Sequence, residues 1–528
     1  MIAEVDPLAP QESALRSAPS WARALFGLLS GASALSIASL LAALLSTWSA
    51  VDAVGSSFID RTPAWLKDLA IAWFGDDNKT ALRIGIFVVL AALALTLGLA
   101  SRTSPTPILL GIAFLTVLGA VAISERPGAV GRAIGTLVIG SILGSVSSIL
   151  LWTSMTRALR RRSTPSESQV PLGWDRRSFL IAASAVAAGS AGVAAVSVRK
   201  DRIDASRIEA QRPATLPQVG ADRRAVASPA DVHPDIRFIT PNDEFFRIDT
   251  ALSFPRVDLD RWELRIHGLV EEEIRLSYQD LLDLPQTERV ITLCCVSNEV
   301  GGPYIGNAVW QGVLLADLLR SARIAPEAEQ VYSTSLDGWT CGFPVETALD
   351  GRDALIAIGM NGEPLPLRHG FPARLVVPGL YGYVSATKWL SEIELNRWSD
   401  GTGYWLPRGW ARLAPVKTQS RIDVPRRNTN VDPGLVRIAG VAWAQHVGIA
   451  DVEVRIDRGP WGRATLSDDV SDDTWRMWTY DWEATPGNHT IQVRATDKNG
   501  ITQTDTVSPV APDGATGRHT RRVTVLDA

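Results

Sequence analysis

The stretch VITLCCVSNEVGG, residues 290–302, decides how the C-terminal half of this chain is interpreted. Val290 to Leu293 are apolar and mostly β-branched, which favours a buried strand. The strand ends at Cys294 and Cys295, and a loop closed by two glycines follows. A cysteine in this setting is placed to present its thiolate to a ligand, although a small buried hydrophobic role is the common alternative.

The residues on either side of this stretch predict two domains. Residues 237–415 mix strand-like segments such as 262–266 with a short capped helix expected over 277–284. From 416 to 528 the pattern is one of short strands, and residues 452–457 alternate apolar with charged side chains. The sequence therefore predicts an α+β domain followed by an immunoglobulin-like β-sandwich.

A second segment with chemical potential is MNGEPLPLRHGFPAR, residues 360–374, followed by Lys388 and Trp389. It brings His369, Arg374 and Lys388 to proline- and glycine-rich turns. Arginine binds phosphate through paired hydrogen bonds and lysine binds it as a point charge, so this set suits an anionic, phosphate-bearing ligand. Solvated surface cations are the alternative interpretation.

The first 200 residues contain apolar runs of the length that crosses a bilayer. Their backbone must form helices there, because no water satisfies it inside the membrane. We therefore expect four transmembrane helices within 21–152 and a weaker fifth over 178–198, followed by a linker over 199–236. The four strong runs are residues 21–48, 82–100, 107–123 and 133–152.

The arginine-rich loop 153–177 sets the expected orientation, because short cytoplasmic loops carry the excess of Lys and Arg. This places the tail 1–20 in the cytoplasm and everything after residue 200 outside the cell membrane. Arg176 and Arg177, before a mildly hydrophobic stretch, resemble a twin-arginine export signal. An ordinary pair of arginines beside a membrane helix is the alternative.

Composition excludes several other classes. The net charge of −4 argues against nucleic acid as a partner, and three cysteines are too few for a disulfide scaffold or an iron–sulfur protein. All six histidines lie beyond the last expected span and no CxxCH motif occurs, so we expect no haem. The span interiors also lack the polar residues of a transport path.

Together these motifs resemble the sulfite oxidase family of molybdopterin enzymes. The resemblance covers nearly all of 237–528, including a C-terminal part similar to the family's dimerisation domain. The matching segments are Cys-Val-Ser-Asn at 295–298, Met-Asn-Gly-Glu-Pro-Leu-Pro at 360–366, His-Gly-Phe-Pro-x-Arg at 369–374, Lys388-Trp389-Leu390 and Phe245-Phe246.

The resemblance implies molybdopterin as cofactor, with Cys295 as the thiolate that ligates molybdenum and Cys294 as its buried neighbour. His369, Arg374 and Lys388 match positions that bind the pterin and its phosphate. Asn298, from the cysteine motif, and Phe246, from the early cofactor-contact segment, complete the expected site. A small-molecule substrate and an external electron carrier are implied as partners, and the dimerisation-type domain is compatible with a homodimer.

Four positions depart from the sulfite-oxidising pattern. Glu299 and Ile358 replace an arginine and a tyrosine, while Ser385-Ala386 and Asp249-Thr250 replace an Arg-His and an Asn-His pair. Fewer cations near the metal weaken the capture of a doubly charged oxyanion. We therefore expect oxygen-atom transfer in the form of S- or N-oxide reduction, or a sulfite-like oxidation. A non-catalytic binding protein that displays an Ig-like module on a membrane anchor is the alternative.

Overall fold

The structure is a computed structural model that describes residues 18–63, 66, 69, 73–74, 78–126, 130–160, 176–224, 228–252, 254–255, 257–427 and 429–527. It divides into a helical unit, residues 1–204, and a C-terminal unit, residues 205–528. Most of the expected cytoplasmic tail and of the arginine-rich loop lies outside the described residues. Arg176 and Arg177 form the first turn of the following helix.

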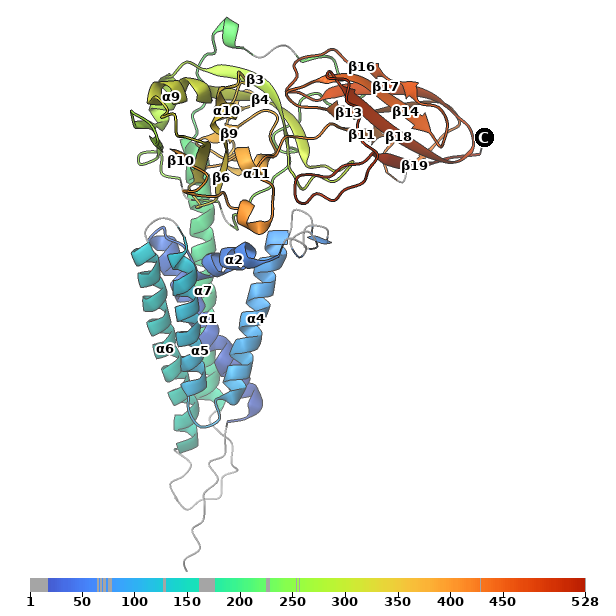
Figure 1. Cartoon of the computed structure of the whole chain (residues 1–528). Helices are drawn as coiled ribbons and strands as arrows, with labels where there is room; N and C mark the ends of the chain where they lie inside the picture. The colour runs from blue at the N-terminus through green and yellow to red at the C-terminus, as the bar shows by residue number, and fades with distance from the viewer. Residues whose placement is uncertain are drawn as a thin grey trace, which may run out of the picture. The chain divides into compact units, whose positions relative to one another are not determined.

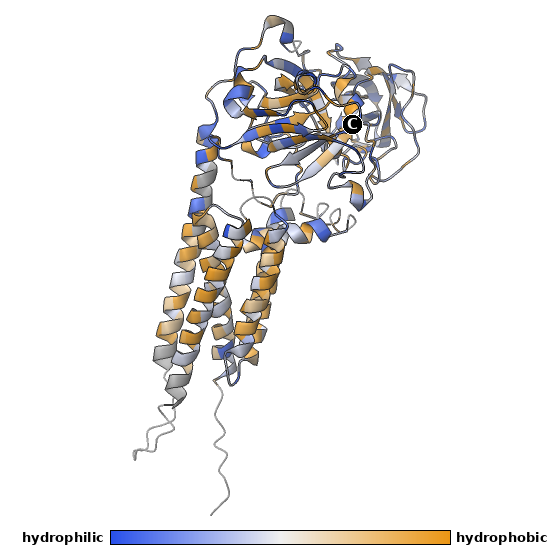
Figure 2. Cartoon of the chain, turned by 60° about the vertical axis from the view of Figure 1, so that its left-hand side comes forward, coloured by the Kyte–Doolittle hydropathy of each residue, from blue (hydrophilic) through white to orange (hydrophobic). Residues whose placement is uncertain are grey.

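Five helices in the described part of the helical unit are long and apolar enough to cross a membrane, as the sequence predicts. Figure 1 shows them as long coils, and Figure 2 shows apolar residues along their length. They contain the candidate spans within α1 (Ser20–Leu44), α4 (Asn78–Ala100), α5 (Thr106–Ser124), α6 (Val130–Arg160) and α7 (Arg176–Gln211).

Small residues let these helices approach closely. A Cβ placed on Gly27 of α1 would lie 2.1 Å from the carbonyl oxygen of Ala94, and one on Gly98 of α4 would lie 2.3 Å from that of Arg23. Farther along α1, a Cβ on Gly140 of α6 would lie 2.5 Å from the Cα of Ala38. Close backbone approach at small residues is the usual basis of helix association in membranes.

Two helical segments differ from the sequence-based expectation. Between the first two expected spans, where the sequence analysis predicts no helix, lies α2 (Ala50–Arg61), which Ser49 caps by accepting a hydrogen bond from the Asp52 amide. Helix α7 continues to Gln211, past residue 199 where the linker was expected, because residues 199–212 contain no glycine or proline and Pro213 comes only after the helix ends.

The C-terminal unit begins with two sheets that form the α+β domain. One has the strand order β3-β4-β7-β8, with β9 also paired to β7, and the other has the order β2-β1-β10-β5-β6. The strands are β1 (Glu263–Gly268), β2 (Ile274–Ser277), β3 (Thr287–Cys294), β4 (Ile305–Leu314), β5 (Gln330–Ser335), β6 (Thr340–Pro344), β7 (Leu355–Met360), β8 (Glu363–Pro364), β9 (Arg374–Val376) and β10 (Leu390–Asn396).

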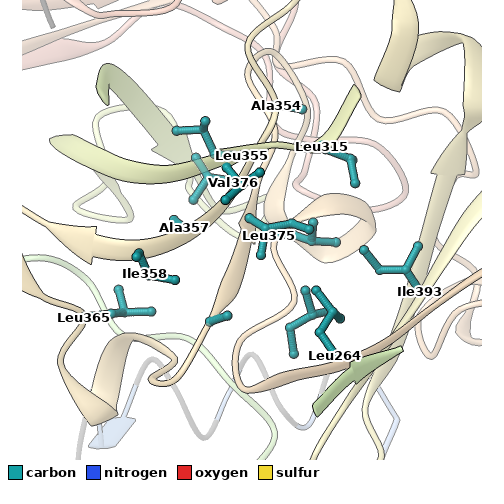
Figure 3. Close-up of a cluster of buried hydrophobic side chains, with 14 of the residues drawn as sticks. Leu264, Leu315, Ala354, Leu355, Ala357, Ile358, Leu365, Leu375, Val376 and Ile393 are labelled. Carbon is teal, nitrogen blue, oxygen red and sulfur yellow. The ribbon is translucent and has the colours of Figure 1, made fainter. Parts of the chain in front are cut away.

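One hydrophobic core joins the two sheets and includes Leu264 and Ile393 from one, and Leu355 and Leu375 from the other. Figure 3 shows these side chains pointing toward one another. The short helices are α8 (Tyr278–Asp283), α9 (Leu315–Ala322), α10 (Val345–Leu349) and α11 (Gly382–Ser385). Ser277 caps α8 as predicted, in a capping box with Asp280.

The remaining residues form the predicted β-sandwich. Its sheets have the orders β11-β13-β17-β16 and β12-β19-β18-β14-β15, and their inner faces share an apolar core. No cysteine occurs after Cys341, so no disulfide bond joins the two sheets. The strands are β11 (Gln419–Val424), β12 (Asn430–Val431), β13 (Gly434–Trp443), β14 (Ile449–Ile456), β15 (Gly462–Arg463), β16 (Thr465–Leu466), β17 (Arg476–Ala484), β18 (Gly487–Asp497) and β19 (Thr520–Val525).

Candidate active site

Cys295 lies at the start of the loop between the paired strands β3 and β4. Its amide donates a hydrogen bond to the carbonyl oxygen of Tyr304 at 2.9 Å, and its own carbonyl accepts one from the amide of Asn298 at 3.0 Å. The loop then turns at Gly301, whose φ of 78° favours glycine. These bonds fix the cysteine at a tightly folded strand end, as the sequence predicts.

Asn298 occupies the inside of this loop and is buried. Its Oδ1 accepts a hydrogen bond from the amide of Tyr304 at 2.8 Å. Its Nδ2 is buried and has no hydrogen-bond partner of good geometry in the part of the chain that the structure describes. The carboxamide nevertheless opposes part of the rise in the pKa of Cys294. A buried donor left in this state is costly, so it suits an acceptor atom of a ligand.

The two adjacent cysteines differ in their surroundings. Burial raises the pKa of Cys294 well above its usual range, and its side chain packs in a hydrophobic cluster with Trp475 and Met477. Burial also raises the pKa of Cys295, but hydrogen bonds with Ser297 oppose that rise. All three cysteines are free thiols, and Cys341 contacts the hydroxyl groups of Ser333 and Thr387.

His369, Arg374 and Lys388 are brought together around Gly370. A Cβ on Gly370 would lie 3.1 Å from the Cβ of Arg374 and 3.0 Å from the Cβ of Lys388, and its φ is 117°. Arg374 donates through Nη1 to the carbonyl oxygen of His369 at 3.0 Å. All three side chains are buried, and the structure thus gathers the cationic set that the sequence predicts.

Burial lowers the pKa of all three basic side chains in this set and so determines which of them are charged. It lowers the pKa of His369 to about 3, that of Arg374 to about 9 and that of Lys388 to about 8. His369 is therefore neutral near pH 7. Its Nε2 lies 2.7 Å from the carbonyl oxygen of Asn242, so Nε2 carries the proton and Nδ1 is left as an acceptor.

Asp249 is the site residue whose role the sequence analysis missed. It is buried and pairs with both Lys388 and Arg247, the latter at 2.9 Å. Its negative charge opposes the fall in the pKa of Lys388. The buried carboxyl of Asp337 also lies nearby, and Asp249 adds to the rise that burial causes in its pKa. The carboxyl groups of Asp249 and Asp337 thus offset part of the positive charge of Arg247 and Lys388.

Phe245 and α11 connect the cysteine loop with the cationic residues. The Phe245 ring packs on Gly306, the β4 residue paired with Leu293, and its centroid lies 5.7 Å from that of His369. Phe246 stacks on Phe245 at 5.0 Å. On the other side, α11 begins at Gly382, where a Cβ would lie 3.9 Å from the carbonyl oxygen of Cys294. The chain reaches Lys388 six residues later.

The other positions that depart from the sulfite-oxidising pattern provide no charge that replaces the missing cations. Ile358 is fully buried in the hydrophobic core, and Ser385 donates its hydroxyl hydrogen to the carbonyl oxygen of Tyr381 at 3.1 Å. Glu299 is exposed on the cysteine loop. Among the described residues, no group of three or more His, Cys, Asp and Glu side chains is arranged to hold a metal ion.

Acid is expected to destabilise the C-terminal unit through its buried histidines. Burial lowers the pKa of His519 to about 4, from 6.5, as it does for His369. The unfolded chain takes up protons below pH 6.5 that the folded chain does not, so the free energy of unfolding falls as the pH drops toward 4. Thermal unfolding of the full chain between pH 7 and 4 should show a shallower fall for His519→Asn than for the native chain.

His489 provides the control, because Asp457 raises its pKa instead. Its contribution is fully present below pH 6.5 and is lost as the pH rises through the raised value. His489→Asn should therefore not flatten the acid limb. Equal slopes for the native chain and His519→Asn would show that His519 is not held neutral by burial.

Comparison with known proteins finds matches in the same part of the chain. A family model described as an oxidoreductase molybdopterin binding domain matches residues 251–405, which contain Cys295, Asn298, His369, Arg374 and Lys388. Phe246 and Asp249 lie just before the matched range.

Curated relatives are similar over the C-terminal part of the chain. Human mitochondrial sulfite oxidase is 29% identical over 322 residues, which are 52% of this chain and 58% of the relative. Sulfite oxidase of Gallus gallus is 30% identical, with 52% of this chain and 70% of the relative covered. The uncharacterized oxidoreductase YuiH of Bacillus subtilis is 36% identical over 153 residues, covering 29% of this chain and 74% of the relative. The chain thus spans little more than half the length of the human relative.

The solved structure of the sulfane dehydrogenase SoxCD from Paracoccus pantotrophus is also similar to this chain. It is 24% identical, with 60% of this chain and 91% of that chain covered and a TM-score of 0.47.

Proposed function

Because this chain belongs to the sulfite oxidase family of molybdopterin-dependent oxidoreductases, we propose that its C-terminal unit transfers an oxygen atom to or from a small substrate. The cofactor of the family is molybdopterin, and when bound it supplies the two-electron chemistry of that transfer. The electrons pass to or from an external carrier.

We propose Cys295 as the ligand to molybdenum. The support is its position at a strand end held by hydrogen bonds, close to the buried Nδ2 of Asn298, which has no hydrogen-bond partner of good geometry among the described residues. The positive charge of a metal ion keeps a coordinating thiol deprotonated, which reverses the effect of burial on its pKa. Cys294 packs in a hydrophobic cluster instead, so Cys295 would be the ligand from this pair and the cofactor would supply the others.

The pterin and its phosphate are held by His369, Arg374 and Lys388. Arg374 and Lys388 supply buried positive charge for the phosphate, and neutral His369 offers Nδ1 as a hydrogen-bond acceptor. The half-buried Phe246 ring provides an apolar surface at the edge of the same region. A bound anion would compensate for part of the hydration that Arg374 and Lys388 lose when they are buried on folding.

The charge balance favours a neutral oxide over sulfite as substrate. Asp249 pairs with Lys388 and Arg247, Glu299 stands where an arginine was expected, and Ile358 and Ser385 offer no cation. A doubly charged oxyanion is attracted less strongly to such a site. We therefore propose reduction of an S- or N-oxide as the main reaction, and the Asp249–Lys388 pair is the observation that carries this choice.

Steady-state rates of the full chain test this choice, with a reduced artificial carrier as electron donor for the oxides and an oxidised one as electron acceptor for sulfite. We expect kcat/KM for methionine sulfoxide or trimethylamine N-oxide to exceed kcat/KM for sulfite. Asp249→Asn removes one negative charge and should raise kcat/KM for sulfite relative to the neutral oxides. A native preference for sulfite, unchanged by Asp249→Asn, would contradict the substrate assignment.

The helical unit is proposed to anchor the enzyme in the cell membrane, with residues 1–20 in the cytoplasm and the C-terminal unit outside. The support is the arginine content of the loop 153–177 and the five candidate spans. We further propose that Arg176 and Arg177 direct export of the folded C-terminal unit as a twin-arginine signal. A reporter fused after residue 528 should be active outside in the native chain and lose that activity when both arginines become lysine. Retained external activity would contradict the signal.

A further inference from the structure

The β-sandwich contacts the loop that carries Cys295. Arg421 of β11 donates through Nη1 to the carbonyl oxygen of Gly302 at 3.1 Å. The guanidinium is held from its other side by Asp423, whose Oδ1 accepts from Nε at 2.6 Å. The guanidinium group is thus held by Asp423 while it binds Gly302, which restricts the movement of this end of the loop.

His519 packs against the residue before Gly302. A Cβ on Gly301 would lie 2.3 Å from Cδ2 and 2.4 Å from Nε2 of the His519 ring. The ring itself is fixed, because Nδ1 accepts a hydrogen bond from the amide of Ile422 at 2.9 Å. The backbone of the loop therefore fits against a rigid imidazole, and only glycine leaves room for it.

The strand that leads to Cys295 is held by the same domain. Thr292 donates its amide hydrogen to the carbonyl oxygen of Asp473 at 3.0 Å, and its hydroxyl accepts one from the amide of Trp475 at 2.8 Å. Gln445 donates to the carbonyl oxygen of Thr292. The sandwich thus fixes the chain both three residues before Cys295 and at Gly301 and Gly302, six and seven residues after it.

We propose that Arg421 and His519 are positioning residues for the Cys295 side chain, so that the sandwich forms part of the active site. This inference rests on the proposed role of Cys295 as metal ligand. Residues that orient a metal ligand affect metal binding and activity without touching the substrate. The sandwich therefore controls the geometry at the metal as well as the stability of the unit.

The test compares Arg421→Gln with Arg437→Gln in the full-length holoenzyme. Arg437 is a matched control, because it pairs with Asp481 at 2.8 Å on the same sandwich and, among the residues that the structure describes, donates no hydrogen bond to the other domain. We expect Arg421→Gln to lower kcat about 10- to 100-fold with little change in KM, and to alter the Mo(V) electron paramagnetic resonance spectrum. Arg437→Gln should leave the spectrum and kcat unchanged. A native spectrum and kcat in Arg421→Gln, with only a lower unfolding temperature, would overturn the proposal.

A second pair of variants tests the contact of His519 with Gly301. Gly301→Ala should lower kcat. In the double variant, His519→Asn should restore part of that loss, because asparagine keeps an acceptor for the Ile422 amide and removes the ring edge that obstructs the alanine Cβ. Strictly additive effects of the two substitutions would contradict a direct contact.

Alkylation of cofactor-free full-length protein separates this inference from the proposed function. We expect iodoacetamide to modify Cys295 faster in Arg421→Gln than in Arg437→Gln. Mass spectrometry measures the rate of modification. Equal rates would overturn the positioning role. Absence of molybdenum from the native holoprotein preparation would instead contradict the proposed function, while the alkylation rates still decide the positioning.

Discussion

Cys295→Ser is expected to abolish oxygen-atom transfer, whereas Cys294→Ser should retain much of it. A serine hydroxyl does not replace a thiolate as a soft ligand for the metal, so the variant loses the one ligand that the protein supplies. Cys294 lies in the hydrophobic cluster with Trp475 and Met477, where serine costs packing and leaves the ligand in place. The measurement is kcat/KM with the preferred oxide and an artificial electron carrier.

The comparison of the two cysteines is what makes this prediction specific. Both are buried and adjacent, so a general loss of folding would affect both variants similarly. Thermal unfolding of each variant separates a stability defect from a chemical one. Equal loss of activity in the two variants, at equal stability, would show that the wrong cysteine has been assigned as the ligand.

Lys388→Met is expected to weaken retention of the cofactor about 10- to 100-fold, on the scale observed when residues around a metal centre are replaced. Methionine has a similar length and no charge, so the phosphate loses a buried cation. The substitution also leaves Asp249 with one fewer cationic partner, although Arg247 remains at 2.9 Å. Cofactor released during gel filtration at increasing phosphate concentration measures the effect.

Lys417→Met is the matched control for this substitution. Lys417 also pairs with a carboxylate, that of Asp513 at 2.9 Å, but it lies in the sandwich outside the cationic set. Its replacement should change cofactor retention little. Similar losses in the two lysine variants would indicate that charge anywhere on the unit matters, and would remove the support for a phosphate site at Lys388.

Local sequence patterns were sufficient for the spans and for several candidate site residues. An uncharged run of bilayer length has few structural alternatives, so the five helices follow from composition. Cys295, His369, Arg374 and Lys388 stood out because they lie at a strand end or beside turns, whereas Asn298 came only from the resemblance to a family; their roles stay predictions. Helix α2 was missed because its 12 residues include polar and charged side chains and carry no strong apolar run.

Contacts between distant segments were beyond prediction from one sequence. Asp249 and Lys388 are 139 positions apart, and Arg421 and Gly302 are 119 apart. No local pattern distinguishes Asp249 or Arg421 from ordinary surface residues, because the packing of the sheets determines which residues they contact. The sequence therefore indicated candidate cofactor-binding residues, whose roles stay predictions, but not the residues that pair with them or pack against them.

Metal analysis of the purified full-length protein tests the central claim most directly. The account predicts molybdenum in stoichiometric amount with the native chain and its loss from Cys295→Ser, with Cys294→Ser retaining the metal. A native chain with no more than a trace of molybdenum, when expressed in cells that make the cofactor, would contradict it.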